Sequence, residues 1–261
     1  MMYSVILHYT SFACKRNNMN NTIQELMDRK SVRVFTGKAI SKEDKELILT
    51  VATQAPTAGN QQLYTIIDVT DQKLKDRLAV TCDNQPFIAQ ADMVLVFVAD
   101  CQKWYEGFKD NGTQPRNPGV GDLMLAVTDT AIAAQNAVVA AESLGIGSCY
   151  IGDIMENAEI HKEIFKLPEY TFPAVMLVFG YPTQQQRERE KPKRVELSYV
   201  VHENFYRTMD AEERRDMWED KATAISYEEW MKRFCERKYN SDFSKEMSRS
   251  VEVYLKGFLR N

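Results

Sequence analysis

The stretch "DLMLAVTDTAIAAQNAVVAAES", from Asp122 to Ser143, is an alanine-rich run followed closely by Gly145. Alanine has the highest intrinsic helix propensity, and a glycine just past the last helical residue is a common stop signal. The stretch therefore predicts one long helix. Because its small side chains let another backbone approach closely, we expect this helix to lie at the centre of the molecule or at a subunit interface.

Runs of β-branched and aromatic residues on both sides of this helix predict strands. The runs are "LYTIIDVT" (Leu63 to Thr70), "MVLVFVAD" (Met93 to Asp100) and "AVMLVFGYP" (Ala174 to Pro182). A further helix is predicted through Ile160 to Phe165. The helices and strands do not follow a strict βαβ order, which favours an α+β fold over a doubly wound sheet.

Capping patterns predict two shorter helices nearer the N-terminus. Thr22 with Glu25, and Ser41 with Asp44, each stand at the head of an apolar stripe. The segment "WYEGFKDNGTQPRNPGVG" (Trp104 to Gly121) is predicted to be a long mobile loop, because Gly, Pro and Asn break every periodicity in it. Beyond Met209 the chain is charged and predicted to be helical.

The bulk composition restricts the classes of function. With 33 basic and 37 acidic residues the net charge is 33 − 37 = −4, so nothing global attracts nucleic acid or an anionic membrane. No run approaches the roughly 18 apolar residues that span a bilayer. Five cysteines at irregular spacings, without a CxxC pair, fit a cytoplasmic protein and disfavour a disulfide framework. Three scattered histidines disfavour a metal centre.

The opening 18 residues have an apolar stretch, but Lys15 and Arg16 follow that stretch instead of preceding it. This order is not typical of a signal peptide. Since a sensible start follows at Met19, we expect residues 1–18 to be a dispensable extension.

The stretch "DRKSVRVF", Asp28 to Phe35, places three cations around a serine between two predicted helices. If this chain is extended, Arg29, Ser31 and Arg33 share one face, and Val32 and Val34 share the other. Guanidinium groups beside a hydroxyl suit a phosphate monoester, because each planar group donates two hydrogen bonds. Taken alone, the stretch is better explained as a solvated basic turn.

Three further motifs are each ambiguous by themselves. "APTAGNQQLY" (Ala55 to Tyr64) offers carboxamides and small residues that suit a flat heterocycle, or is an ordinary helix-to-strand turn. "GIGSCYIGD" (Gly145 to Asp153) is not GxGxxG and follows a helix, which excludes the dinucleotide fingerprint. "KPKR" (Lys191 to Arg194) is a solvated loop, or closes the other side of the same phosphate.

In this order, "RKSVRVF", "APTAGNQ", "AAESLGIGSCYIG" and "KPK" before "VVHEN" resemble the flavin-dependent nitroreductase superfamily, most of all its oxygen-insensitive NAD(P)H nitroreductase and NADPH-flavin oxidoreductase branch. The likeness runs from about Met19 to about Tyr206. It implies an α+β fold with a mainly antiparallel core sheet flanked by helices, in an intertwined homodimer that holds FMN at its interface. Residues 19–206 would form the FMN-binding domain. Residues 207–261 would form a helical extension that packs on the same domain or on the partner.

The resemblance also implies roles for individual residues. The FMN phosphate and ribityl chain would be held by Arg29, Lys30, Ser31 and Arg33, with Lys191 and either Lys193 or the adjacent Arg194 closing on the phosphate. The flavin ring would be lined by Thr57, Ala58 and Asn60, reached by Gln85, and contacted by the backbone of Tyr150, Ile151 and Gly152. Asp153 replaces a glycine that is frequent in the family, and a carboxylate at this place would alter the potential of the flavin.

The implied activity is the ping-pong, two-electron reduction of nitroaromatics, quinones or free flavin by NADPH or NADH, without a catalytic side chain, since FMN carries the chemistry. The absence of GxxxxGK[ST] and GxSxG motifs agrees with this. The preferred nucleotide stays open. "KYNSDFSKEMSRS" lacks the paired arginines of the branch's C-terminal loop, and "ERRDMWED" (Glu213 to Asp220) lies too early in the chain to be that loop. The alternatives are a flavin reductase that feeds another system, and a flavin-binding or sensing protein without turnover.

Overall fold

A four-stranded antiparallel sheet forms the centre of the computed structural model, which describes residues 20–260. Its strands are β1 (Tyr64–Asp68), β2 (Met93–Asp100), β3 (Gly147–Ile151) and β4 (Thr171–Gly180), in the order β1-β2-β4-β3. Every residue of β2 is buried, which explains its continuous apolar run. The predicted α+β fold with an antiparallel core sheet is confirmed.

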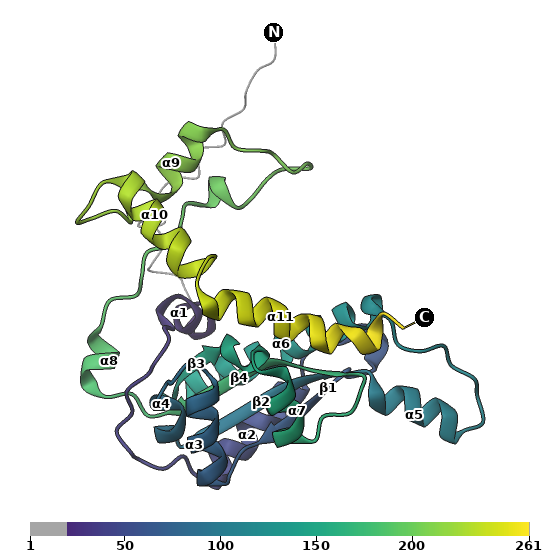
Figure 1. The fold of residues 1–261 in the computed structure, drawn as a ribbon. Helices are drawn as coiled ribbons and strands as arrows, with labels where there is room; N and C mark the ends of the chain where they lie inside the picture. The colour runs from purple at the N-terminus through teal and green to yellow at the C-terminus, as the bar shows by residue number, and fades with distance from the viewer. Residues whose placement is uncertain (1–19, 261) are drawn as a thin grey trace.

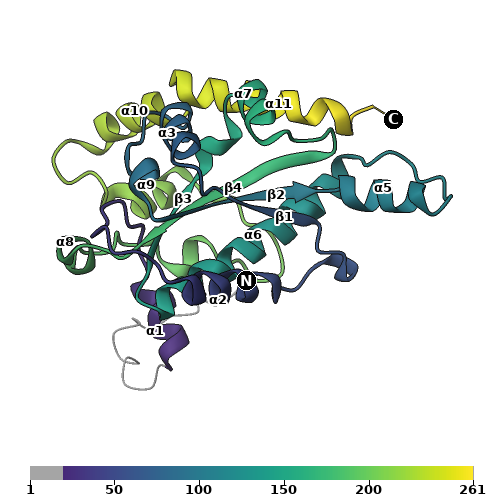
Figure 2. The ribbon, with the colours of Figure 1, turned by 90° about the horizontal axis from the view of Figure 1, so that it is seen from below.

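Helices cover both faces of the sheet (Figures 1 and 2). One face carries α6 (Val120–Ser143) and α2 (Lys42–Thr53), and the other carries α3 (Gln72–Thr81), α7 (Ala158–Phe165) and α11 (Asp242–Phe258). The alanine stripe of α6 is fully buried against Leu95, Phe97 and Leu177 of the sheet. Among the described residues α6 is the one helix apolar and long enough to cross a membrane, but its buried alanines identify it as the predicted core helix.

The two N-terminal helices form as predicted, with one correction. α1 (Asn21–Asp28) is capped by Asn20, whose Oδ1 accepts from Ile23 N at 3.0 Å, so Thr22 is already helical. Asparagine is the stronger cap, and it stands two residues ahead of the predicted one. α2 is capped by Ser41, whose Oγ accepts from Asp44 N at 3.0 Å, as predicted.

The predicted mobile loop at Trp104 to Gly121 is wrong in its first half, where α5 (Gln102–Asp110) forms. The helix is stabilised by aromatic contacts that single-residue propensities do not reveal. Trp104 lies 5.6 Å from Phe108, and Tyr105 packs edge-on against Tyr170 of the body at 5.1 Å. Tertiary packing has therefore overridden the glycine in the middle of the helix.

The C-terminal part forms an arm, residues 195–241, that carries α9 (Ala211–Glu219) and α10 (Tyr227–Lys238) away from the sheet (Figure 1). Helix α11 then returns to the body. The remaining short elements are α4 (Phe87–Gln90), α8 (Gln184–Glu188) and the 3-10 turns Ala58–Asn60, Gly152–Met155 and Leu197–Tyr199. The predicted N-terminal extension, residues 1–18, lies outside the described residues.

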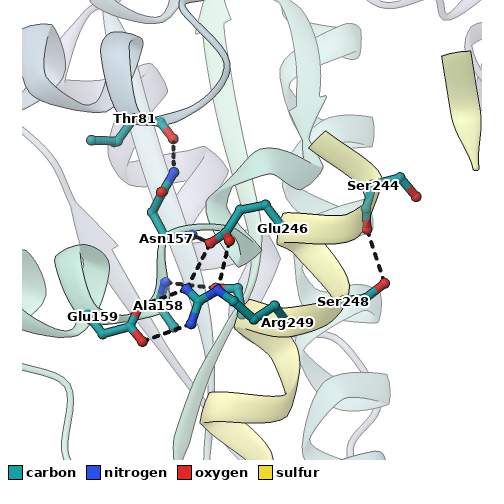
Figure 3. A network of polar contacts seen from close by, with 9 residues as sticks. Thr81, Asn157, Ala158, Glu159, Ser244, Glu246, Ser248 and Arg249 are labelled. Atoms are coloured by element: carbon teal, nitrogen blue, oxygen red, sulfur yellow. Dashed lines mark hydrogen bonds and ion pairs between the residues drawn. The ribbon is translucent and has the colours of Figure 1, made fainter. Parts of the chain in front are cut away.

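A polar network fastens α11 to the body (Figure 3). Arg249 donates to both carboxylate oxygens of Glu159 at 3.0 and 2.9 Å, and also to Glu246. Ser250 Oγ accepts from Ala158 N at 2.7 Å, and Asn157 Nδ2 donates to the carbonyl of Thr81 at 2.8 Å. This network joins α11, the start of α7 and the end of α3, and so holds the helix that follows the arm against the body.

Candidate flavin site

The basic stretch lies as an extended segment against the end of the sheet. Ser31 forms a parallel bridge with Ser148 of β3, and Val32 N donates to the Ser148 carbonyl at 2.9 Å. Phe35 forms a second bridge with Pro182. The predicted alternation holds for buried Val32 but not for Val34, which is 47% exposed, because only isolated bridges pair this segment with the sheet.

Two glycines make room for this segment. A Cβ atom at Gly147 would lie 2.6 Å from Cγ2 of Val32, and one at Gly180 would lie 2.6 Å from the ring of Phe35. Such contacts are closer than real Cβ atoms allow. Because these glycines of β3 and β4 have no side chain, Val32 and Phe35 pack directly against the two strands. The glycines therefore set the distance between the basic stretch and the sheet.

The segment Arg187 to Lys191 lies directly beside the basic stretch, and of the predicted Lys191 to Arg194 motif it includes Lys191. Arg189 donates from Nη2 to the Ser31 carbonyl at 2.7 Å, and Lys30 Nζ donates to the carbonyls of Arg187 and Arg189 at 2.5 and 2.6 Å. Lys191 Nζ donates to the Met27 carbonyl at 2.6 Å. Lys30 and Lys191 thus hold the two segments together through backbone carbonyls. Arg189 was not predicted, because it lies in a run of charges where no residue stands out.

Arg29, which is partly buried, is the member of the stretch with buried donors that lack a partner. Among residues 20–260, its Nε and Nη2 atoms are buried without a hydrogen-bond partner. Its guanidinium carbon lies 5.7 Å above the ring of Tyr150, whose hydroxyl donates to Gln135 Oε1 at 3.0 Å. A buried cation with two vacant donors is costly unless an anion completes it. This arrangement fits the phosphate of FMN.

Gln85, Ile151 and Gly152, which are also predicted near the flavin, lie at the same end of the sheet as the basic stretch. Arg33 lies 5.9 Å from the ring of Phe87, two residues beyond Gln85. Gln85 is held by its own turn, since Nε2 donates to the Cys82 carbonyl at 2.9 Å. In β3 and the turn after it, the side chain of Ile151 is buried and Gly152 is exposed, so backbone at Gly152 is open to a ligand.

The last two predicted phosphate residues lie at the root of the arm. Lys193 Nζ is 3.1 Å from Asp220 Oδ2, and both side chains are largely exposed. Arg194 is also exposed, and its charge, after the effect of burial, helps to lower the pKa of Lys191. Both residues are close to the basic cluster, but neither points to a fixed partner in the body.

Asp153 belongs to a group of carboxylates around Glu156. Glu156 is only 5% exposed, and its Oε1 has no partner among the described residues. Burial, then the charges of Asp153, Asp83 and Glu246, raise the pKa of Glu156 to about 8. Glu156 is therefore protonated at neutral pH.

We expect the protein to lose stability as the pH rises from about 4.5, the ordinary pKa of glutamate, to about 8. In this range the unfolded chain releases the Glu156 proton while the folded chain keeps it. Rising pH therefore stabilises the unfolded state relative to the folded state. The expected loss is of the order of 2 kcal/mol, and it is complete above the raised pKa. Urea unfolding at pH 5 and pH 8 measures it. Glu156→Gln should flatten the profile, and the exposed Glu252→Gln should not; equal slopes in both variants would contradict the assignment.

The residues predicted to line the flavin ring are held by a buried aspartate of α6. Asp129, 3% exposed, accepts from Thr57 Oγ1, from Ala58 N at 3.0 Å and from Leu63 N at 3.3 Å. Asn60 is exposed and adopts a left-handed φ of 56°. Sequence reasoning missed Asp129, although a lone aspartate in an alanine-rich helix is a signal, since buried aspartates are almost always paired.

Asp129→Asn should destabilise the protein by about 1–2 kcal/mol, because an amide offers one acceptor oxygen for three donors. The turn at Thr57 to Asn60 should loosen at the same time. Chemical denaturation gives the loss of stability, and hydrogen exchange at the amides of Ala58 and Leu63 locates it. The exposed neighbour Thr128→Ala is the matched control; a change below about 0.5 kcal/mol for Asp129→Asn would refute the anchoring role.

The predicted site residues form two groups. One is the basic stretch with Gln85 and Tyr150, and the other is the ring-lining turn with Thr57, Ala58 and Asn60. The two groups lie at opposite ends of one protomer. Ser148, beside the basic stretch, is in register with Phe179 and Met93, whereas Tyr64, beside the ring-lining turn, is in register with Ala99. Met93 and Ala99 are six residues apart, which is about 20 Å along a strand. One protomer therefore brings together the basic, Gln85 and Tyr150 residues, but not Thr57, Ala58 and Asn60.

Residues 26–181 match the model of the nitroreductase family. The chain belongs to this family. A Cr(VI) reductase from Pseudomonas sp. (strain G-1) is 35% identical over 199 residues, 76% of this chain and 81% of that protein. An FMN reductase (NADPH) from Bacillus subtilis is 29% identical over 93% of this chain and 97% of its own length.

A solved structure shares the fold over most of the chain. The NADPH:FMN oxidoreductase from Vibrio harveyi, solved in complex with NAD+, superposes with a TM-score of 0.76 at 26% identity, covering 90% of this chain and 98% of that one. The coverage extends beyond the 26–181 segment. The arm and α11 are thus part of the shared architecture.

Proposed function

We propose that this nitroreductase-family chain is an FMN-dependent NAD(P)H oxidoreductase that reduces small-molecule acceptors such as nitroaromatics, quinones or free flavin. The observation that carries the proposal is the pair of buried Arg29 nitrogens, Nε and Nη2, that lack a partner within a cluster of cations. The names of the B. subtilis FMN reductase (NADPH) and the V. harveyi NADPH:FMN oxidoreductase support the same activity.

The residues present would hold FMN as follows. Arg29 would donate from Nε and Nη2 to the phosphate, with Ser31 and Arg33 beside it and Lys191, Lys193 or Arg194 adding positive charge. The open backbone at Gly152 would face the ring, and Asp153 would place a negative charge near it. When bound, FMN supplies the transfer of two electrons, so the protein needs only to hold and shelter the ring.

The separation of the two groups of site residues supports a homodimer with the flavin at its interface. Since Thr57, Ala58 and Asn60 lie about 20 Å from the basic stretch of their own protomer, they would line the flavin that the partner's basic stretch holds. Large apolar side chains on α1 and in the arm are exposed in one protomer, including Leu26, Met27, Phe205 and Tyr206. Residues 19–206 would form the FMN-binding unit, with the helical part from 207 onward packing on the body and the partner in a cytoplasmic enzyme.

A flavin-binding protein without turnover is the second candidate, because "KYNSDFSKEMSRS" lacks the paired arginines of the branch's C-terminal nucleotide loop. Purified protein should be yellow under either proposal. Anaerobic bleaching by NADPH or NADH supports the enzyme alone, and steady-state rates with menadione, FMN and a nitroaromatic identify the donor. Colourless protein that takes up no FMN would refute both.

Arg33→Ala should weaken FMN binding about tenfold, through the loss of one charge-assisted hydrogen bond. The expected effect is modest because Arg33 is exposed. Fluorescence titration of the apoprotein with FMN measures it. Unchanged affinity would place the phosphate away from this residue.

A further inference from the structure

Three side chains in contact connect α6 with the proposed phosphate site. Gln135 of α6 accepts through Oε1 from the hydroxyl of Tyr150 at 3.0 Å, and the ring of Tyr150 lies 5.7 Å from the guanidinium carbon of Arg29. A cation within about 6 Å of the centre of an aromatic ring is attracted to the ring face. Tyr150 therefore contacts Arg29 with its ring and α6 with its hydroxyl.

The backbone of Arg29 is fixed by α1, but its long side chain needs a contact of its own. Arg29 is the residue after α1, and its N–H donates to the Glu25 carbonyl at 2.8 Å. Among residues 20–260, Nε and Nη2 of the guanidinium are buried without a hydrogen-bond partner. Hydrogen bonds through these atoms therefore do not select a rotamer, and ordering an arginine side chain costs entropy. The ring of Tyr150 restricts the rotamers instead.

The hydrogen bond between Tyr150 and Gln135 fixes the ring without adding a charge. Burial raises the pKa of Tyr150 to about 12, although the charge of Arg29 opposes this rise. The phenol thus keeps its proton at neutral pH and donates it to the neutral amide of Gln135. A carboxylate in place of this amide would bring a negative charge towards Arg29 and compete with a phosphate.

Two carboxylates, Glu25 and Glu142, line the same narrow cleft as Arg29 and Gln135. Neither of them accepts a hydrogen bond from Nε or Nη2 of Arg29. Burial raises the pKa of Glu142, and the charge of Arg29 opposes this rise. The cleft therefore attracts the guanidinium weakly, and its two buried donors stay available to a ligand.

We infer that Tyr150 and Gln135 are positioning residues, which orient the Arg29 guanidinium for the phosphate of the flavin and leave its charge uncancelled. The inference rests on the proposed function. Both side chains act through Arg29, since the Tyr150 ring faces the guanidinium and the Tyr150 hydroxyl is bonded to α6. The property that they control is the preference for FMN over riboflavin, which has the same ring system but no phosphate.

The first experiment measures this preference by fluorescence titration of the apoprotein with FMN and with riboflavin. Tyr150→Phe keeps the ring and removes the hydroxyl, whereas Gln135→Met keeps the length of the side chain and removes the acceptor. Each variant should weaken FMN binding about fivefold and change riboflavin binding by less than about twofold. Two residues that merely shape the flavin pocket would weaken both ligands alike, and that result would overturn the inference.

Asn136 supplies the matched control, because it is the neighbouring carboxamide of α6. Its Nδ2 donates to the Val51 carbonyl of α2 at 3.4 Å. Asn136→Leu should leave the ratio of the two dissociation constants within about twofold of the wild-type ratio, whatever its effect on stability. A ratio that falls as far as in Gln135→Met would mean that any lost carboxamide of α6 has this effect, and would overturn the assignment.

The second experiment tests whether the two residues act through Arg29. In an Arg29→Met background, Gln135→Met should weaken FMN binding by less than about twofold more, because the group that it positions is gone. The double variant Tyr150→Phe with Gln135→Met should bind FMN about as well as either single variant. Additive losses in these double variants would show that the residues affect the flavin by another route, and would contradict the positioning role.

Gln135→Glu tests the need for a neutral group. The carboxylate still accepts from the Tyr150 hydroxyl, but it brings a negative charge into the cleft that Arg29 lines. FMN binding should therefore fall about tenfold, which is more than in Gln135→Met, while riboflavin binding changes little. An FMN affinity equal to that of wild type would refute the inference.

The wild-type protein separates a failure of this inference from a failure of the proposed function. If wild type binds neither ligand, or binds FMN and riboflavin equally, the phosphate site fails, and both the proposed function and this inference are overturned. If wild type prefers FMN, and Tyr150→Phe and Gln135→Met keep the whole preference, the proposed function stands and only the positioning role is overturned.

Discussion

Arg29→Met should weaken FMN binding about a hundredfold while making the flavin-free protein more stable. The guanidinium has two buried donors without a partner among residues 20–260, so the apoprotein bears its desolvation and the phosphate would relieve it. Methionine at position 29 removes both the desolvation cost in the apoprotein and the contact with the phosphate. We expect the free energy of unfolding of the apoprotein to rise by about 1 kcal/mol. Fluorescence titration with FMN and urea unfolding of the apoprotein measure the two effects.

Weaker FMN binding together with a more stable apoprotein would distinguish an arginine that binds a ligand from an arginine that stabilises the fold. A structural arginine would lose stability on replacement, because its hydrogen bonds to the protein would be lost. Lys73→Met removes the same charge from the exposed start of α3 and should leave both quantities nearly unchanged. A destabilised Arg29→Met apoprotein that still binds FMN normally would show that Arg29 serves the fold.

Gly147→Ala should lower the free energy of unfolding by about 2–3 kcal/mol and weaken FMN binding more than tenfold. The new methyl group would lie 2.6 Å from Cγ2 and 2.9 Å from Cβ of Val32, so either β3 or the basic stretch must move. Moving the stretch displaces Arg29 and Ser31 together. Thermal unfolding of the apoprotein and FMN titration give the two losses.

A second substitution makes this prediction specific. Val32→Ala in the Gly147→Ala background removes the methyl groups that clash, and should restore part of both stability and FMN binding. Gly121→Ala, on the exposed side of α6 with no heavy atom within 4 Å of the new Cβ, should be neutral or slightly stabilising. A double variant that is no more stable than Gly147→Ala alone, and binds FMN no better, would mean that the contact between residue 147 and Val32 does not cause the two losses.

Local patterns were sufficient for most secondary structure. The alanine run from Asp122 to Ser143 predicted α6 within two residues, and the β-branched runs predicted β1 and β2. They succeeded because periodicity and capping act over a few neighbouring residues. The prediction failed at α5, where Trp104 and Tyr105 are stabilised by contacts with Gln61 and Tyr170, far away in the chain.

The order of four motifs was sufficient to recognise the family, and hence to name the residues expected at a flavin site. It could not show that these residues lie at two ends of the sheet, because their positions depend on strand register. Nor could it show that Lys30 and Lys191 bind backbone carbonyls while Arg29 keeps free donors, since all three are only cations in a sequence.

The sequence by itself determined that this chain forms an α+β nitroreductase fold with a local basic site, because residue types, spacing and motif order carry that information. The tertiary structure alone decided which cation is buried and unpaired, which aspartate holds the turn at Thr57 to Asn60, and how far that turn lies from the basic stretch. The physical reason is that burial and pairing depend on groups that are distant in sequence. Asp129 and Leu63, or Arg189 and Ser31, meet only after the sheet and α6 have packed.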